Sequence, residues 1–507
     1  MEILSASQIR QADQFTIDHT PISSVDLMER AARKCFDWFN NNVSKDHFVH
    51  IVCGPGNNGG DGLALARMLF LEGYNLKVSI LHLKKQLSSD CQVNMDRLKT
   101  LKKVDIEDLN ADSNPIIFEE RSILVDAIFG TGFSGKTEGL AATTIRQMND
   151  SNLPIISIDM PSGVSSDKTS LKAGNEIIKP NTTLTFQYLK IAMMMAENAS
   201  YFGRIEVLDI GLLRQALENM SIQNFITDSE VLSTIYEPKR EFSHKGTFGH
   251  TLLITGGEGK MGAAILAARS FLKSGGGLLT VYVPTAGVPI IQEAVPEAMA
   301  LHYSETKRDL PDFETYKAIG VGPGIGTGLV PTAILDQVLN IKNKHLVLDA
   351  DALNIISMHP EWLTRLPEGS ILTPHPGEFK RLAGTWNNDF EKLEKQRELA
   401  QAHKIYLILK GKFTSIACPD GTMWFNPTGN PGMAKGGSGD ILTGLLTGLI
   451  SSGYSAFETC ILGTWLHGMA GDLAAELLTQ EAMNASDIID QIPQAWKKLI
   501  SLKINPI

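Results

Sequence analysis

The sequence predicts an α/β protein of two domains, each a mostly parallel β-sheet covered by helices on both faces. Short apolar runs alternate with helical patterns along most of the chain, as they do where helices join parallel strands. The alternation weakens over residues 212–243, between two series of runs, and 507 residues are more than one ordinary domain holds. We therefore place the domains at residues 1–222 and 223–507.

The first series of runs defines the N-terminal domain. Its opening forty residues carry apolar side chains at helical spacing, from Ile9 to Phe39, and a further helix is expected at 63–72. The strands are expected at the apolar runs 48–53, 77–83, 123–129, 155–160, 184–188 and 203–211.

The second series begins after the polar segment and defines the C-terminal domain. Its last third, from 437 to about 478, is expected to be nearly all helix. Gly275, Gly276 and Gly277 are expected to end one helix and begin the next strand, without a chemical role. The strands are expected at 251–255, 278–284, 318–321, 346–349, 371–374 and 405–410.

Composition and charge argue against several classes of function. There are 46 lysines and arginines against 56 aspartates and glutamates, and this net charge of −10 offers no overall attraction to nucleic acid or an anionic membrane. Five scattered cysteines without a C-x-x-C pair argue against a disulfide framework or a structural zinc site. No secretory signal or membrane-spanning apolar run is visible. We expect a cytoplasmic homo-oligomer that acts on small molecules, with no nucleic-acid or membrane partner.

A glycine-rich segment, GPGNNGGDG at 54–62, follows the first expected strand and precedes a helix. In a parallel sheet such a turn lies at the carboxyl edge, where ligands bind. Glycines let a ligand approach the backbone, and the amides at a helix start favour an anion such as a phosphate. The segment matches neither G-x-G-x-x-G nor a Walker A loop, and a tight left-handed turn without a ligand is the alternative.

Acidic and small polar residues end two later strands, in VDAIFGTG at 125–132 and IDMPSG at 158–163. Together with the glycine-rich segment, these strand ends are expected to bring Asn58, Asp126, Asp159 and Ser162 into one crevice. Oxygen ligands of this kind suit a hard cation, and an aspartate beside them could act as a general base. A strand-end aspartate that only caps a helix is the competing interpretation.

The motifs NNGGDG, DAIFGTG and SIDMPSG resemble those of the NAD(P)H-hydrate epimerase domain, which has a Rossmann-like three-layer fold. That family interconverts the R and S forms of NADHX and NADPHX, cofactors damaged by addition of water to the nicotinamide ring. The resemblance implies a potassium ion held by Asn58, Asp126 and Ser162, with Asp159 transferring the proton. It implies a hydrate-binding set of Asn57, Asn58, Gly59, Gly60, Asp61, Gly130, Thr131, Gly132, Phe133, Ser134, Gly135, Lys136 and Asp159.

In the second domain, AKGGSGD at 434–440 opens a helix of small residues. Its glycines leave amide groups free at the positive end of that helix, which suits a phosphate. Asp440 lies in the first turn, where it could accept a proton from a substrate hydroxyl; a capping aspartate is the alternative. Three other strand ends are expected at the same site: KGKFT at 410–414 for a phosphate, VGPGIG at 321–326 for substrate, and TPHPGE at 373–378.

The set VGPGIG, LDADALN, TPHPGE and AKGGSGD is similar to the ADP- or ATP-dependent NAD(P)H-hydrate dehydratases, whose fold is ribokinase-like. The resemblance implies a hydrate site at Gly324, His375 and Asp440, with Mg²⁺ as a cofactor. Asp349 and Asp351 are candidate neighbours of magnesium or substrate, with a structural role for at least one as the alternative. The implied ADP site consists of Lys410, Gly411, Lys412, Phe413, Thr414, Asn430, Lys435, Gly436, Gly437, Ser438 and Gly439.

Together the resemblances cover nearly the whole chain and imply a bifunctional repair enzyme. It would epimerise the hydrates and dehydrate the S form with ADP, giving NADH or NADPH, AMP and phosphate. Asp440 would take the hydroxyl proton while ADP donates its terminal phosphoryl group. Two alternatives stay open: a ribokinase-like small-molecule kinase, and a first domain that binds a partner without catalysis.

Overall fold

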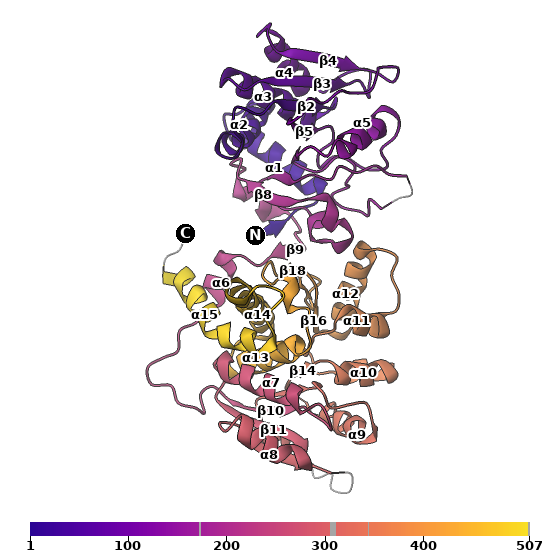
Figure 1. Cartoon of the computed structure of the whole chain (residues 1–507). Coiled ribbons are helices and arrows are strands. Elements are labelled where there is room, and N and C mark those ends of the chain that lie inside the picture. Colours follow the sequence, from indigo (N-terminus) through magenta and orange to yellow (C-terminus); the bar gives the residue numbers. More distant parts are fainter. Residues whose placement is uncertain (172–173, 305–310, 343, 505–507) are drawn as a thin grey trace. The chain divides into compact units, whose positions relative to one another are not determined.

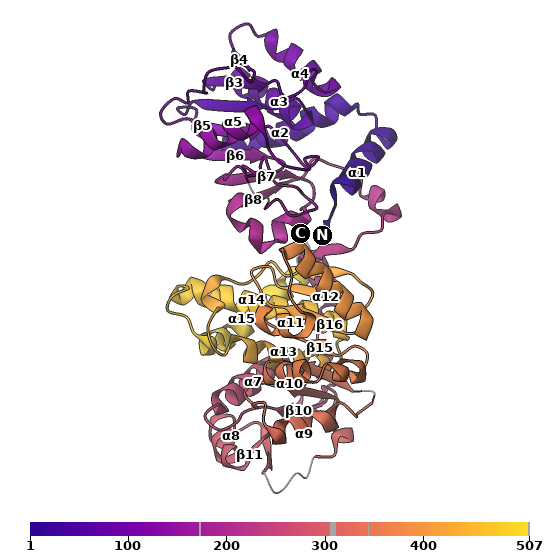
Figure 2. The ribbon, with the colours of Figure 1, turned by 90° about the vertical axis from the view of Figure 1, so that its right-hand side faces the viewer.

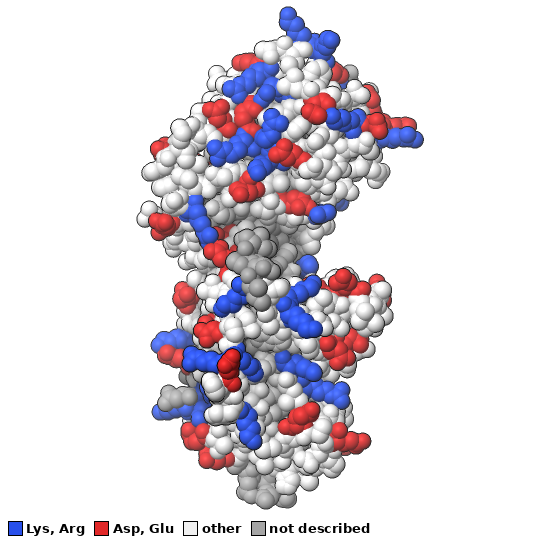
Figure 3. Space-filling view, turned by 90° about the vertical axis from the view of Figure 1, so that its left-hand side faces the viewer, with Lys and Arg blue, Asp and Glu red and all other residues white. Residues whose placement is uncertain are grey.

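The computed structural model describes residues 1–171, 174–304, 311–342 and 344–504. The chain divides into two compact units (Figures 1 and 2): the N-terminal unit is Glu2–Ile222 with Asn388–Phe390, and the C-terminal unit is Met1 with Gln223–Asn387 and Glu391–Ile507. No helix within the described ranges is both long and apolar enough to cross a membrane. On the face drawn in Figure 3, acidic and basic side chains are interspersed over each unit.

The sheet of the N-terminal unit has the strand order β4-β3-β2-β5-β6-β7-β8, and its neighbouring strands pair in parallel. Because the order reverses between β2 and β5, a crevice for a ligand is expected at their carboxyl ends. The strands are β2 (Val49–Cys53), β3 (Leu76–Leu81), β4 (Asp105–Leu109), β5 (Ile123–Ala127), β6 (Ile155–Ile158), β7 (Thr182–Phe186) and β8 (Arg204–Leu208), and a short β1 (Glu2–Ile3) precedes them.

Helices cover both faces of this sheet, with α2, α3 and α4 on one face and α5 on the other (Figure 1). The first forty residues form two helices, because the chain leaves helical geometry at Thr20 and the Ser23 hydroxyl caps a new start. The helices are α1 (Ala6–His19), α2 (Ser24–Asn42), α3 (Asn57–Leu71), α4 (Ser89–Lys99) and α5 (Gly139–Asp150), with 3₁₀ turns η1 (Ile191–Met194), η2 (Ala196–Tyr201) and η3 (Arg214–Asn219).

The glycine-rich segment corrects two expectations. Helix α3 begins at Asn57 and not at residue 63, so most of this segment is helix and not turn. None of its glycines has a positive φ, so the left-handed turn is wrong as well. The glycines are needed for close packing: a Cβ on Gly59 would lie 1.8 Å from the Gly54 carbonyl oxygen, and one on Gly62 would lie 2.6 Å from Ala127 Cβ. The start of α3 is thereby pressed against the ends of β2 and β5.

The sheet of the C-terminal unit has the order β9-β18-β17-β16-β15-β14-β13-β10-β11-β12. Its pairs are parallel except β16–β17 and β17–β18, which form an antiparallel meander. The strands are β9 (Asn224–Ile226), β10 (His250–Ile254), β11 (Leu278–Pro284), β12 (Met299–Tyr303), β13 (Ala318–Val321), β14 (His345–Leu348), β15 (Ile371–Leu372), β16 (Tyr406–Leu409), β17 (Ser415–Ala417) and β18 (Met423–Phe425).

Helix α13 (Ser438–Ser452) is the central helix of this unit and packs on α7 (Met261–Ser274). Glycines make the approach close, because a Cβ on Gly448 would lie 1.8 Å from Ser274 Oγ. Gly275, at φ +97°, ends α7 as the sequence predicts. The segment from 437 to 478 is nearly all helix, as expected, and forms two helices that are separated at Gly453. The other helices are α6 (Ser229–Ile235), α8 (Val288–Ala294), α9 (Leu329–Val338), α10 (Asp351–Met358), α11 (Pro376–Ala383), α12 (Asp389–His403), α14 (Ala456–Leu478) and α15 (Ala485–Ile504).

Candidate active sites

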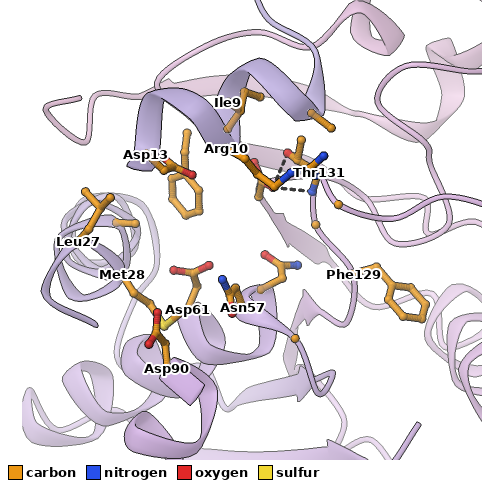
Figure 4. A pocket seen from close by; sticks show the side chains of 18 of the residues that line it. Ile9, Arg10, Asp13, Leu27, Met28, Asn57, Asp61, Asp90, Phe129 and Thr131 are labelled. Carbon is orange, nitrogen blue, oxygen red and sulfur yellow. Dashed lines mark hydrogen bonds between the residues drawn. The ribbon is translucent and has the colours of Figure 1, made fainter. Parts of the chain in front are cut away.

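A cavity of about 760 Å³ lies in the N-terminal unit where the strand order reverses, roofed by α1 and α2 (Figure 4). Most of the residues expected to bind the hydrate line it: Asn57, Asn58, Asp61, Gly130, Thr131, Gly132, Phe133, Ser134 and Asp159. Gly59, Gly60, Gly135 and Lys136 are not among the lining residues, and Lys136 is exposed. The strand ends predicted from the sequence therefore meet at one cavity.

Asp159 is held in this cavity by a cation that the sequence analysis missed. Lys190 is completely buried, and its Nζ donates to Asp159 Oδ1 at 2.8 Å and to Thr185 Oγ1 at 2.6 Å. The backbone amide and hydroxyl of Thr131 donate to Asp159 Oδ2 at 2.7 and 2.6 Å. Burial alone would raise the pKa of Asp159, but Lys190 and Thr131 outweigh it and hold the pKa below its usual range.

The backbone of Asp159 is strained, since its φ of +63° lies in the left-handed region. A non-glycine residue adopts this conformation at a cost on the order of 1–3 kcal/mol, and such residues are concentrated at functional sites. Met160 and Pro161 follow, and the turn carries Ser162 back towards β5, where its amide donates to Asp126 Oδ2 at 2.8 Å. The strained turn thus presents Asp159 to the cavity and Ser162 to the floor beneath it.

Two further carboxyl groups, from Asp13 on α1 and Asp61 on α3, line the cavity. Burial raises the pKa of Asp61 well above its ordinary value. Burial, and next the charge of Asp159, raise the pKa of Asp13 to about 6, while Lys190 opposes the rise. Sequence reasoning missed Asp13; the available signal was an aspartate on the face that carries Ile9 and Ile17 at helical spacing.

Asp126 and Ser162 lie beneath the cavity, and Asn58 is part of its lining. Asp126 is fully buried and accepts hydrogen bonds from the Ser162 hydroxyl at 2.5 Å, from Ser157 Oγ at 2.8 Å and from the Ile128 amide at 3.3 Å. Burial nevertheless raises its pKa. The side-chain oxygen and nitrogen of Asn58 are buried without a hydrogen-bond partner. Such an orphaned amide calls for a ligand, because an unsatisfied buried polar group costs about 1–3 kcal/mol.

The C-terminal unit holds a second acidic site, at the start of α13. Gly437, at φ +95°, turns the chain into the helix, and Asp440 lies in its first turn. Lys410 Nζ lies 2.7 Å from Asp349 Oδ1, and the Thr443 hydroxyl donates to Asp349 Oδ2 at 2.8 Å. Burial, followed by the charge of Asp349, raises the pKa of Asp440 to about 6, and Lys410 opposes the rise. The segments predicted from β14, β16 and α13 therefore meet.

The other residues expected near the hydrate have structural contacts. Asp351 Oδ2 accepts from the Gly326 amide at 2.8 Å, so this side chain fixes the glycine loop that contains Gly324. His375 caps α11: its ring accepts from the Gly377 amide at 2.9 Å, and the side chain remains exposed. The hydrogen bond to Gly326 therefore supports the alternative that at least one of Asp349 and Asp351 has a structural role.

Hydrogen bonds to neighbouring protein groups hold the segments that are expected to bind ADP. Lys412 Nζ donates to the Gly429 carbonyl at 3.3 Å, and Lys435 Nζ donates to the Glu481 carbonyl at 2.6 Å. Asp472, which the sequence analysis missed, accepts from Asn430 Nδ2 at 3.0 Å and from the Gly429 amide at 2.9 Å. These contacts shape the loop before α13 and turn both lysines towards carbonyl groups.

Two family models match the chain: YjeF-related protein N-terminus at residues 24–192 and NAD(P)H-hydrate dehydratase at residues 251–494. The bifunctional NAD(P)H-hydrate repair enzyme Nnr of Moorella thermoacetica is 34% identical in sequence, and the match covers 98% of this chain and 97% of that protein. The enzyme of the same name from Thermofilum pendens is 31% identical over 98% and 97%.

Two solved structures resemble the C-terminal unit. An ADP/ATP-dependent NAD(P)H-hydrate dehydratase from Bacillus subtilis, co-crystallised with ATP and Mg²⁺, is 32% identical with a TM-score of 0.50, over 55% of this chain and 100% of that one. A ribokinase-like superfamily protein from Enterococcus faecalis is 28% identical with a TM-score of 0.50, over 55% and 98%. These likenesses confirm the predicted fold class, and the chain belongs to the family of bifunctional NAD(P)H-hydrate repair enzymes, which have isomerase and lyase activities.

Proposed function

We propose that residues 1–222 carry the epimerase and residues 223–507 the dehydratase. The observation that carries this division is that each unit contains its own acidic site, and that each site lies wholly within one unit. Asp159 and its partners fall in the unit matched by the YjeF-related model, and Asp440 falls in the range matched by the dehydratase model. The substrates would be NADHX, NADPHX and ADP, handled by a cytoplasmic homo-oligomer without nucleic acid.

For the dehydratase site we propose Asp440 as the general base. Its carboxylate is at the positive end of α13 and has a pKa of about 6, so most of it is ionised at neutral pH. It would remove the proton of the substrate hydroxyl while that oxygen attacks the terminal phosphorus of ADP and AMP departs. The ring nitrogen then donates its lone pair, phosphate leaves, and the neighbouring ring carbon loses a proton to give the dihydronicotinamide. Gly324 and His375 would contact the hydrate.

The nucleotide would lie on the loops before α13 and after β16. The backbone of Gly436, Gly437, Ser438 and Gly439 at this helix start suits its phosphates, and a Cβ on Gly439 would come within 3.0 Å of Lys410 Nζ. Lys410 is therefore close enough to the helix start to offset phosphoryl charge. Mg²⁺, with which the Bacillus subtilis enzyme was co-crystallised, would neutralise charge on the phosphates. Asp349, whose carboxylate contacts Lys410 and Thr443, would lie next to this Mg²⁺.

For the epimerase site we propose that Asp159 accepts the proton during inversion of the hydroxyl-bearing carbon. Its lowered pKa keeps it ionised, and Lys190 and Thr131 fix its orientation. The hydrate would contact the start of α3 and the loop from Gly130 to Ser134, which line the cavity.

We also propose that Asn58, Asp126 and Ser162 hold a potassium ion beneath the hydrate. The support is the Asn58 amide, buried without a partner at the start of α3, together with the hydrogen-bonded oxygens of Asp126 and Ser162 at the end of β5 and after β6. A bound monovalent cation would supply positive charge next to the substrate. The chain's own part is to keep these oxygens desolvated and fixed, which the hydrogen bonds to Asp126 accomplish.

Product analysis on pure S hydrate tests the dehydratase assignment. Incubated with ADP, the chain should release AMP, phosphate and the dihydronicotinamide cofactor in equal amounts. A stable phosphorylated product that accumulates with the spent nucleotide would instead identify a small-molecule kinase of the ribokinase class and would contradict the proposal.

A further inference from the structure

Four aspartates line the cavity of the N-terminal unit, and two of them are held by protein contacts, Asp90 by the Ser24 hydroxyl and Asp159 by two partners. Asp159 is bound by Lys190 and Thr131. In contrast, no hydrogen bond or ion pair joins the Asp13 or Asp61 carboxyl to another of the residues described here. Figure 4 shows both side chains directed into the same space, Asp13 from α1 and Asp61 from α3. These two groups are free to meet a ligand.

The position of Asp13 has no structural explanation. Helix α1 is fixed by the capping box between Ser5 and Gln8, and the face that lines the cavity carries Ile9, Arg10, Asp13, Gln14 and Ile17. A largely buried aspartate is costly to ionise unless it is paired. It caps no helix and pairs with no lysine or arginine in the described part of the chain. A functional contact with the ligand would account for it.

Resting on the proposed epimerase function, we propose that Asp13 is a further catalytic residue, the general acid that protonates the hydroxyl group of the hydrate. The carbon–oxygen bond then breaks and its electron pair leaves with water, while the lone pair of the adjacent ring nitrogen forms a carbon–nitrogen double bond. Water adds to the opposite face of that carbon and gives its extra proton to Asp159. Asp13 regains a proton, and Asp159 loses one, by exchange with solvent. The net result is inversion, with no other reactant consumed.

The electrostatics of the cavity suit this division of roles. The charged groups that face Asp13 are Arg10 on its own helix, Asp61 and Asp90 from α3 and α4, Lys84, and the Asp159–Lys190 pair. Burial and the Asp159 charge raise the pKa of Asp13 to about 6, and Lys190 with Thr131 lower that of Asp159. Two neighbouring carboxyl groups whose pKa values are driven apart are the usual signature of an acid and a base.

The test measures R-to-S conversion by the full chain, without nucleotide, between pH 6 and 8.5. In wild type the rate should fall as the pH rises above about 6, because the protonated form of Asp13 is the active one. Asp13→Asn should lower kcat by about 10²–10⁴ and leave KM within about threefold. Asp13→Glu should be faster than Asp13→Asn and keep the fall with pH. Asp18→Asn, an exposed position on the same helix, is the control and should match wild type.

Several results would overturn the assignment. If Asp13→Asn epimerises at a near wild-type rate, Asp13 is not the general acid. If the whole loss of activity comes from a higher KM, Asp13 binds the hydrate and does not protonate it. If Asp13→Asn does not fold, the pH dependence of the Asp13→Glu variant is the test. A rate of R-to-S conversion that does not fall above pH 6 in this variant would contradict the proposal. Inversion in heavy-oxygen water must place the label in the hydrate, since unlabelled product excludes carbon–oxygen cleavage. A wild-type chain no faster than spontaneous epimerisation refutes the proposed function itself, which is a separate outcome.

Discussion

Lys190 Nζ lies 2.8 Å from Asp159 Oδ1, and this lysine is completely buried in the segment after β7. The pair joins the strained turn after β6 to the segment after β7, and its two residues are 31 positions apart in the sequence. It fixes one carboxylate in the ionised state while two others in the same cavity are pushed towards the neutral form. This asymmetry underlies the acid and base roles proposed for the epimerase.

Lys190→Met should leave the buried Asp159 carboxylate without its cation. We expect the pKa of Asp159 to rise, epimerisation to slow, and the free energy of unfolding of this unit to fall by about 3 kcal/mol at pH 7. Because the folded pKa of Asp159 is below the unfolded one, the pair stabilises the fold above about pH 4 and the gain is lost in acid. Urea unfolding at pH 7 and pH 4 should show a smaller difference from wild type at pH 4, because the variant's Asp159, whose pKa burial then raises, is neutral at pH 4. Exposed Lys179→Met is the control, and an equal loss there would contradict the role of the pair.

Asp440→Asn should abolish dehydration and leave epimerisation intact. Asparagine keeps the shape but cannot take the hydroxyl proton, so the rate on S hydrate should fall by about 10²–10⁴. Near wild-type dehydration in this variant would show that Asp440 is not the base.

The same variant has a second readout in stability. Since the pKa of Asp440 is raised in the folded state to about 6, its ionisation opposes folding as the pH rises from 4 to above 6. We expect Asp440→Asn to stabilise the C-terminal unit by on the order of 1 kcal/mol at pH 8 and not at pH 4. If Asp440→Asn changes the free energy of unfolding by the same amount at pH 4 and pH 8, the pKa of Asp440 is not raised in the folded state.

Asn58→Ala should weaken activation of the epimerase by potassium. The Asn58 amide atoms are buried without a partner, so their removal breaks no hydrogen bond and should cost little stability. Titration of the epimerisation rate with potassium chloride, at constant ionic strength, should show a higher half-saturating concentration than in wild type. An unchanged titration with an unchanged rate would exclude Asn58 as a ligand.

Cutting the chain between residues 222 and 223 should separate the activities. Each fragment retains its own sheet and its own acidic site, and about 220 and 285 residues suffice for independent cores. The first fragment should equilibrate the epimers without nucleotide, and the second should dehydrate S hydrate and leave R hydrate to its spontaneous epimerisation. If the second fragment hydrolyses ADP on S hydrate only when the first is added, the division of roles is wrong.

The sequence predicted the order of buried strands well, because strands such as β2 and β5 are covered on both faces and read as continuous apolar runs. It did not predict β4, whose residues are mostly partly exposed, or β17 and β18, which are three residues each. It also misplaced the start of α3, since glycines at Gly59 and Gly62 disfavour a helix unless close packing requires them.

In the candidate sites, too, the sequence predicted some residues and missed others. Motif residues such as Asp126, Asp159 and Asp440 stand beside glycines at strand ends and helix starts, where spacing alone indicates a ligand site. Lys190 carries no such signal, and Asp13 has only its position between Ile9 and Ile17, because the importance of both depends on contacts between residues far apart in the chain. Only the fold brings a helix near the N-terminus over the carboxyl end of β6.

The most direct test of the account follows recovery of dihydronicotinamide absorbance from a mixture of R and S hydrates. With the full chain and ADP, we predict recovery of the whole mixture, faster than spontaneous epimerisation allows, and no recovery without nucleotide. The Asp440→Asn variant should give none with ADP, although its epimers should still equilibrate. Recovery that stops at the share of the S form, or that does not depend on nucleotide, would contradict the claim that one chain both epimerises and dehydrates the hydrate.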